Sequence, residues 1–124
     1  MKYLVLMYAN ESEAPQTQEE LQALQPAWYA YMQEAQAAGA LLSNGGVAPG
    51  ARATTVRVRN GKPLITDGPF AETHEQLGGY YMMECKDLDE AIQWAAKIPG
   101  AKYGSIEGRP VNVWTQARDD AAAR

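Results

Sequence analysis

The sequence has few of the residues on which most small metal-binding or disulfide-stabilised domains depend. Its 124 residues include one cysteine, one histidine and one phenylalanine. A single cysteine excludes an intrachain disulfide, and one histidine beside one cysteine gives no metal-ligand pattern. Nucleophile-elbow, phosphate-loop and cofactor fingerprints are also missing. We therefore expect no metal site and no cofactor.

Long apolar runs and basic runs are missing as well. The chain begins with a charge and an apolar run, but this run turns polar after Ala9 without a convincing cleavage site, so we interpret it as a strand rather than a signal peptide. No stretch approaches the ~18 apolar residues of a membrane span. Eleven basic and fifteen acidic residues give a formal charge of −4, which disfavours nucleic-acid backbones and anionic membranes. We expect a cytoplasmic protein without either partner.

What is present is an apolar content sufficient for one domain. Hydrophobic residues make up 46% of the chain, which excludes disorder by composition. Residues 2–9 and 80–83 are apolar at successive positions, as is typical of central strands that are buried on both faces. The sequence therefore predicts a single core built around at least two central strands.

Two helices are indicated by capping patterns followed by apolar residues at helical spacing. Thr17 with Glu20 precedes one helix, and Asp87 with Glu90 precedes the other. Pro26 lies inside the first helix, where its ring and missing N–H are expected to kink the helix or split off its first turns.

The remaining segments predict strands and complete the element order. Residues 53–66 form two arms around Asn60-Gly61, the strongest short hairpin signal. We expect a short strand at 40–43 that is broken by Asn44-Gly45-Gly46. The segment 105–111 is expected to be an edge strand because it contains Pro110. The order predicts an α+β fold, ferredoxin-like β-α-β-β-α-β with an inserted β-hairpin.

This architecture leaves one face of the sheet uncovered, because two helices cover only the other. Leu4, Leu6 and Tyr8 alternate with Tyr3 and Val5, so both faces of the first strand are apolar. Exposed patches of this kind are unusual on soluble monomers. We therefore predict a homodimer in which the open faces pack sheet to sheet as a dimeric α/β barrel. The alternative is that the 45–78 insertion folds over the open face.

The middle of the chain resembles a known family. The segments that carry the likeness are Thr66–Thr73 (TDGPFAET), Glu75–Tyr81 (EQLGGYY), Asp87–Ala91, Arg109-Pro110 and Thr54–Arg57. Together they resemble the signature of the DGPF-type, YCII-related proteins over residues 1–114, which leaves 115–124 as a polar C-terminal tail. The resemblance implies a dimeric α/β barrel with ferredoxin-like subunits. It implies no settled activity, and for DGPF-type members it implies a link to extracytoplasmic-function sigma factors.

Asp67 is the candidate catalytic residue. It ends a predicted strand, and the rigid Gly68-Pro69 turn that follows would hold its carboxylate. In a cleft near Tyr80 or Tyr81, such a carboxylate is able to act as a general base. The alternative is an Asx-type turn, in which the carboxylate accepts backbone N–H bonds and shapes the loop.

The candidate ligand-binding residues are two arginines and three aromatic residues: Arg57, Arg109, Tyr80, Tyr81 and Trp28. A guanidinium group can hold a carboxylate with two hydrogen bonds, and aromatic side chains can line a small pocket. Each has an ordinary alternative, namely a solvated arginine or a packed core aromatic. Because Glu107 and Arg109 are two apart on one strand, we expect them not to pair directly. His74 is expected to be exposed.

These observations leave two classes of function open. The first is a small-molecule enzyme of unknown substrate that uses Asp67 in acid/base chemistry. The alternative is a non-catalytic module that binds a ligand or a protein partner in sigma-factor regulation. A dimer with a purely structural role is a third reading.

Overall fold

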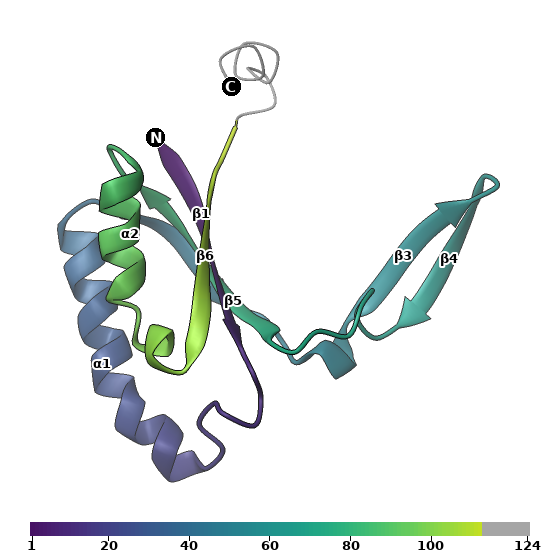
Figure 1. Cartoon of the computed structure of the whole chain (residues 1–124), viewed down its shortest axis with the longest axis horizontal. Coiled ribbons are helices and arrows are strands. Elements are labelled where there is room, and N and C mark those ends of the chain that lie inside the picture. The colour runs from purple at the N-terminus through teal and green to yellow at the C-terminus, as the bar shows by residue number, and fades with distance from the viewer. Residues whose placement is uncertain (113–124) are drawn as a thin grey trace.

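A four-stranded antiparallel sheet backed by two helices forms the body of the molecule, and a hairpin stands away from it (Figure 1). The computed structural model describes residues 1–112, so the predicted tail at 115–124 lies outside the described residues. The strands of the body, in spatial order, are β2 (Leu41–Gly46), β5 (Gln76–Glu84), β1 (Lys2–Ala9) and β6 (Gly104–Pro110). The predicted ferredoxin-like fold is confirmed, because β1 and β5 are central and β2 and β6 lie at the edges.

The helices begin where the sequence predicts. The Thr17 hydroxyl accepts a hydrogen bond from the Glu20 N–H at 3.0 Å at the start of α1 (Gln18–Ala37), and Asp87 accepts one from the Glu90 N–H at 2.9 Å before α2 (Leu88–Ala96). Two short 3₁₀ helices follow other loops: η1 (Gly50–Arg52) and η2 (Pro99–Lys102). Among residues 1–112, no helix combines the length and apolar character needed to cross a membrane.

The expected split of α1 at Pro26 is wrong. The helix is continuous from Gln18 to Ala37 with Pro26 inside it. Pro26 is exposed, as is Gln22 one turn earlier, so water can satisfy the carbonyl that the proline leaves without a backbone partner.

The expected break of β2 at Asn44-Gly45-Gly46 is also wrong. Gly45 pairs with Tyr80, and Gly46 pairs with Gly79. A Cβ on Gly45 would lie 2.9 Å from the Tyr80 ring, so glycine permits a close approach here rather than ending the strand. The edge position of β6, inferred from Pro110, is confirmed.

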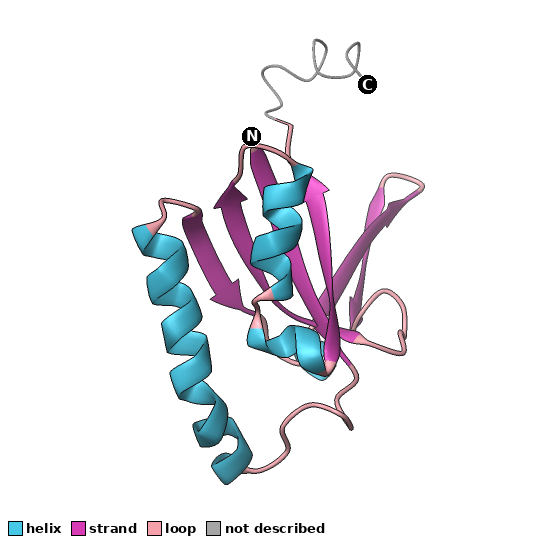
Figure 2. Ribbon diagram, turned by 60° about the vertical axis from the view of Figure 1, so that its left-hand side comes forward, coloured by secondary structure: helices cyan, strands magenta, loops and turns pink. Residues whose placement is uncertain are grey.

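The core lies between the sheet and the helices, which cover one face in both views (Figures 1 and 2). Val5 and Met83 from the sheet are at most 1% exposed. The Tyr31 ring from α1 packs edge-on against Tyr81 and Trp94, with centroid distances of 5.7 and 6.1 Å. The Tyr31 hydroxyl donates to the Trp94 carbonyl at 3.1 Å. These contacts join α1, α2 and β5 into one unit.

The open face of the sheet carries apolar side chains without a helix over them. Leu4, Leu6 and Tyr8 of β1, with Tyr80 and Met82 of β5, alternate with the core-facing residues, and all five are half-buried. The open face is therefore apolar on its two central strands, as the sequence predicts.

The inserted hairpin forms a separate two-stranded sheet of β3 (Thr54–Arg59) and β4 (Lys62–Asp67), which we call the arm. Asn60 and Gly61 have φ values of 52° and 75°, the left-handed conformations that a tight hairpin turn requires. The arm projects on the side of the sheet away from the helices (Figures 1 and 2). Within residues 1–112 its strands pack extensively only against each other, so the insertion does not cover the open face.

Candidate functional site

Asp67 lies at the base of the arm. It is the last residue of β4, pairs with Thr54 and is exposed. The turn after it is held by other groups: the Gly68 N–H donates to the Ala53 carbonyl at 2.7 Å, and the Thr55 hydroxyl donates to the Gly68 carbonyl at 2.8 Å. Among the described residues no N–H donates to the Asp67 carboxylate, so the Asx-type turn is not formed there.

The five predicted ligand-binding residues lie on different parts of the chain: Arg57 on the arm, Tyr80 on the open face, Tyr81 in the core, Arg109 on β6 and Trp28 on α1. One chain therefore does not gather them around Asp67. Tyr80 and Tyr81 point to opposite faces of the sheet because they are consecutive on β5. Their roles, and that of Asp67, stay predictions.

Arg109 forms an ion pair that the sequence argument excluded. Its Nε donates to the Glu107 carboxylate at 3.0 Å. The two residues share a face of β6, and both side chains are long enough to span the gap. This hydrogen bond raises the pKa of Arg109, so the guanidinium already has a carboxylate partner.

His74 and Cys85 lie in contrasting surroundings. His74 is exposed, as predicted, whereas Cys85 is 1% exposed. Burial, and next the nearby Glu90, raises the pKa of the Cys85 thiol, which makes it a poor nucleophile. Within residues 1–112, no group of three histidine, cysteine or carboxylate side chains is placed to hold a metal ion.

A cavity of about 350 Å³ lies where β1 ends and β5 begins, and we call it the Tyr103 cavity. Its walls are largely apolar, with Met7 from β1, Pro15 from the loop before α1, Val47 after β2 and Leu77 from β5. Tyr103 contributes a phenol from the segment between η2 and β6. Apolar walls with a few polar groups are typical of small-molecule sites.

Two glutamine side chains fix the loops around the Tyr103 cavity. Gln76 accepts a hydrogen bond from the Glu11 N–H at 3.3 Å and donates to the Thr73 carbonyl at 2.7 Å. Gln16 donates to the carbonyls of Ala14 and Glu11. Because these amides are engaged with backbone groups, the loop between β1 and α1 is held in a defined position beside the cavity.

Tyr103 and Glu11 are the polar lining residues of this cavity whose side chains have no hydrogen-bond partner among residues 1–112. Burial raises the pKa of Tyr103, so the phenol is protonated at neutral pH. No hydrogen bond joins its hydroxyl to any residue within 1–112. It can therefore donate to an acceptor oxygen of a molecule inside the cavity.

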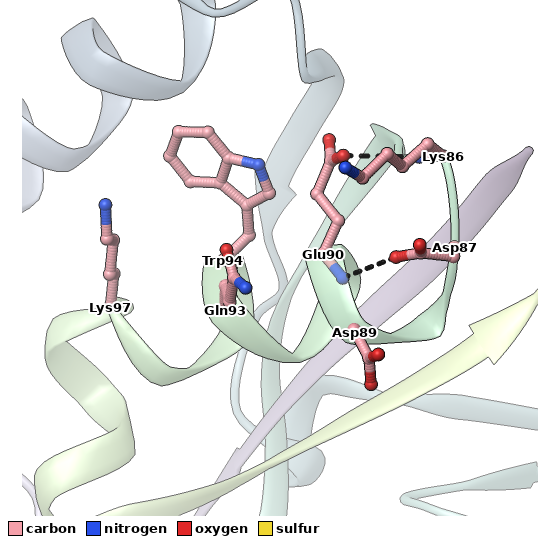
Figure 3. Close-up of a pocket in the computed structure, with 7 residues that line it drawn as sticks. All are labelled: Lys86, Asp87, Asp89, Glu90, Gln93, Trp94 and Lys97. Atoms are coloured by element: carbon pink, nitrogen blue, oxygen red, sulfur yellow. Dashed lines mark hydrogen bonds between the residues drawn. The ribbon is translucent and has the colours of Figure 1, made fainter.

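A second cavity, of about 460 Å³, has a different character. Its lining comes from α2 and the residues flanking it (Figure 3). Asp87 and Glu90 in this lining already take part in capping α2, and Lys97 is paired with Glu34 of α1 at 2.6 Å, over the Trp94 ring. This cavity is therefore a charged helix surface whose groups bind one another.

No sequence motif predicts the Tyr103 cavity. Its lining comes from four separated stretches of the chain, residues 7–16, 47–49, 76–78 and 103, which carry no spaced motif. Only the fold brings these stretches to the same end of the sheet.

The family assignment follows from a match over nearly the whole chain. The model of the YCII-related domain matches residues 1–115, including the Asp67-Gly68-Pro69-Phe70 turn at the base of the arm. The chain belongs to the YCII family. The predicted family is therefore confirmed.

Two further likenesses place this YCII protein among known sequences and structures. An uncharacterized protein of Rhizobium meliloti (strain 1021) is 36% identical over 117 residues, covering 92% of this chain and 94% of that protein. In structure, the chain is similar to 5-chloro-2-hydroxyhydroquinone dehydrochlorinase from Burkholderia phenoliruptrix AC1100, solved in complex with 2,5-dihydroxybenzoquinone. The TM-score is 0.54 at 14% identity, over 90% of this chain and 94% of that one. At that identity the likeness supports the fold.

Proposed function

We propose that this YCII protein binds a small organic molecule in the Tyr103 cavity. The observation that carries the proposal is the combination of largely apolar walls with the Tyr103 phenol, which has no hydrogen-bond partner among residues 1–112. The cavity volume of about 350 Å³ lies within the usual range for ligand sites. The loop beside it is already fixed by Gln16 and Gln76, so little ordering is needed on binding.

The lining favours a compact, flat ligand with at least one oxygen acceptor. Met7, Val47 and Leu77 offer apolar surface, and the Tyr103 hydroxyl offers one hydrogen bond. The dehydrochlorinase that shares the fold was solved with 2,5-dihydroxybenzoquinone, a ring with carbonyl and hydroxyl oxygens. This compound is therefore a reasonable first probe for the present chain.

Two copies of the chain are proposed to pair through their open faces. The five half-buried apolar side chains on β1 and β5 support this pairing, because a second sheet would remove them from water. We also keep the cytoplasm as the proposed location, on the ground that the sequence holds only one cysteine and Cys85 is buried.

Methionine methyl signals test binding directly. Met7 lines the Tyr103 cavity, whereas Met83 is fully buried in the core. Titration of ¹³C-methyl-methionine protein with 2,5-dihydroxybenzoquinone should shift the Met7 signal saturably and leave Met83 nearly unchanged. Val47→Trp should fill the cavity entrance and abolish the shift. Leu42→Trp, at an exposed position outside the cavity, is the matched control. An unaltered Met7 signal in the wild-type protein would refute the proposal.

The variant Asp67→Asn distinguishes the two functions that the sequence leaves open, an enzyme and a non-catalytic binding module. If the protein is an enzyme that uses Asp67, the variant should bind its ligand but lose conversion of it. If the protein is a non-catalytic module linked to sigma-factor regulation, the variant should match the wild type in both measurements.

A further inference from the structure

One face of the arm carries exposed apolar side chains beyond its base, where Thr54 and Asp67 pair on the same face. Val56 faces Ile65 across the two strands, and Val58 faces Pro63. Val56 and Val58 are each 61% exposed, and Ile65 is 69% exposed. Arg57 lies on the opposite face of the ribbon. The arm is therefore amphipathic, although residues 1–112 offer nothing for the apolar face to pack on.

A ribbon of this kind is poorly stabilised in isolation. A two-stranded hairpin is at best marginally stable in water, because it has no layer to bury its side chains against. The Asn60-Gly61 turn favours the hairpin, but the arm has no extensive contact with the rest of residues 1–112. A surface other than that of residues 1–112 would stabilise it.

The apolar face of the arm is too small to be an interface by itself. Stable interfaces bury about 800 Å² on each partner, and a few side chains on two short strands offer only part of that area. The arm projects on the same side of the body as the open face (Figures 1 and 2). A partner seated on the open face would therefore meet the arm as well.

Charge favours a second copy of this chain as that partner. Residues 50–66 contain Arg52, Arg57, Arg59 and Lys62 and no acidic residue. The rest of the chain then has seven basic and fifteen acidic residues, a net charge of −8. A cationic arm is attracted to the acidic body of another copy, and this attraction steers association.

We propose that the arm of each copy packs its apolar face, formed by Val56, Val58, Pro63 and Ile65, against the second copy that covers the open sheet face. The inference rests on the face-to-face dimer proposed above. Because Arg57 and Asp67 belong to the arm, both then lie at the boundary between subunits. A site around Asp67 is incomplete in one chain and needs the partner's surface.

Two double variants compare the faces of the arm. Val56→Thr with Ile65→Thr replaces one cross-strand pair on the apolar face and keeps good strand formers. Arg57→Thr with Leu64→Thr replaces the neighbouring pair on the opposite face. Sedimentation velocity at a series of protein concentrations gives the dimer Kd. We expect the first variant to raise this Kd by about a hundredfold, because two arms per dimer lose apolar burial. The second variant should change it less than about tenfold.

The outcomes separate this inference from the proposals on which it depends. A wild-type protein that is monomeric throughout refutes both the face-to-face dimer and the docked arm. A wild-type dimer whose Kd is unchanged by the Val56/Ile65 pair refutes the docked arm alone. Binding of a mixed-sequence DNA duplex that is lost with Arg57→Thr would show a nucleic-acid partner and overturn the inference. The Met7 titration reports separately on ligand binding.

A second measurement does not depend on the variants folding well. A spin label on Lys62→Cys sits at the exposed tip of the arm, while Cys85 is buried. Labelled protein is mixed with unlabelled ¹⁵N protein, so any broadening arises between chains. Broadening of amides from the unlabelled copy supports the docked arm, and its absence in a dimeric sample refutes it.

Discussion

The helix-covered face of the sheet and the arm contain similar apolar side chains, but those of the sheet are buried and those of the arm are exposed. Val5 of β1 is 1% exposed, whereas Val56 of β3 is 61% exposed. Both are valines in antiparallel strands. The difference arises from what lies above them: two helices in one case and nothing of the described chain in the other. Strand formation is therefore a local property of this sequence, while burial depends on how the elements assemble.

The largest expected contrast comes from truncating one side chain in each region. Met83→Ala should lower the free energy of unfolding by about 2–5 kcal/mol, because it opens a void in a fully buried site. Val56→Ala should change it by less than about 0.5 kcal/mol in the monomer. Urea unfolding at protein concentrations below the dimer Kd measures both. Equal losses would show that the arm is part of the folding unit of the body.

Glycine-to-alanine substitutions in the body and in the arm should give smaller losses of stability than Met83→Ala. A Cβ on Gly104 would collide with the Tyr8 carbonyl on the neighbouring strand, so Gly104→Ala should cost about 1–3 kcal/mol of global stability. Gly61→Ala meets open space but forces alanine to a φ near 75°, which costs about 1–2 kcal/mol. We expect this second cost to stay within the arm. Hydrogen exchange should show faster arm amides in Gly61→Ala and an unchanged body.

A further effect is confined to alkaline solution. Burial, and next Tyr103, raises the pKa of Tyr81 to about 12 from 10.0. Because the protonated phenol is favoured in the folded protein, its contribution to stability is complete below pH 10 and is lost as the pH rises through about 12. The urea midpoint should therefore fall between pH 10 and 12, and by less in Tyr81→Phe. The arm contains no tyrosine, so no tyrosine within it contributes to this change.

Local features of the fold could be predicted from the sequence because their causes are local. The caps at Thr17 and Asp87 each need one side chain and one N–H three residues later, and both are present. The Asn60-Gly61 turn follows from two left-handed residues. The element order, together with apolar residues on both faces of β1, then predicted a ferredoxin-like sheet with β1 as a central strand.

The predictions that failed depended on surroundings. Gly45 was expected to break β2, but the Tyr80 ring needs the space above it. Pro26 was expected to kink α1 or to split off its first turns; the split does not occur, and the position faces solvent. The Tyr103 cavity was not found because its lining residues meet only in three dimensions. The roles of Asp67, Arg57, Arg109, Tyr80, Tyr81 and Trp28 still await the experiments on the dimer and its ligand.

The burial of Cys85 bears on how copies of this protein can associate. The chain has no other thiol, and this one is shielded by the core. An oxidant therefore cannot form a disulfide bond between two molecules unless the fold is first disrupted. Any pairing remains reversible, so the proportion of paired molecules follows the abundance of the protein, and dilution alone returns them to single chains.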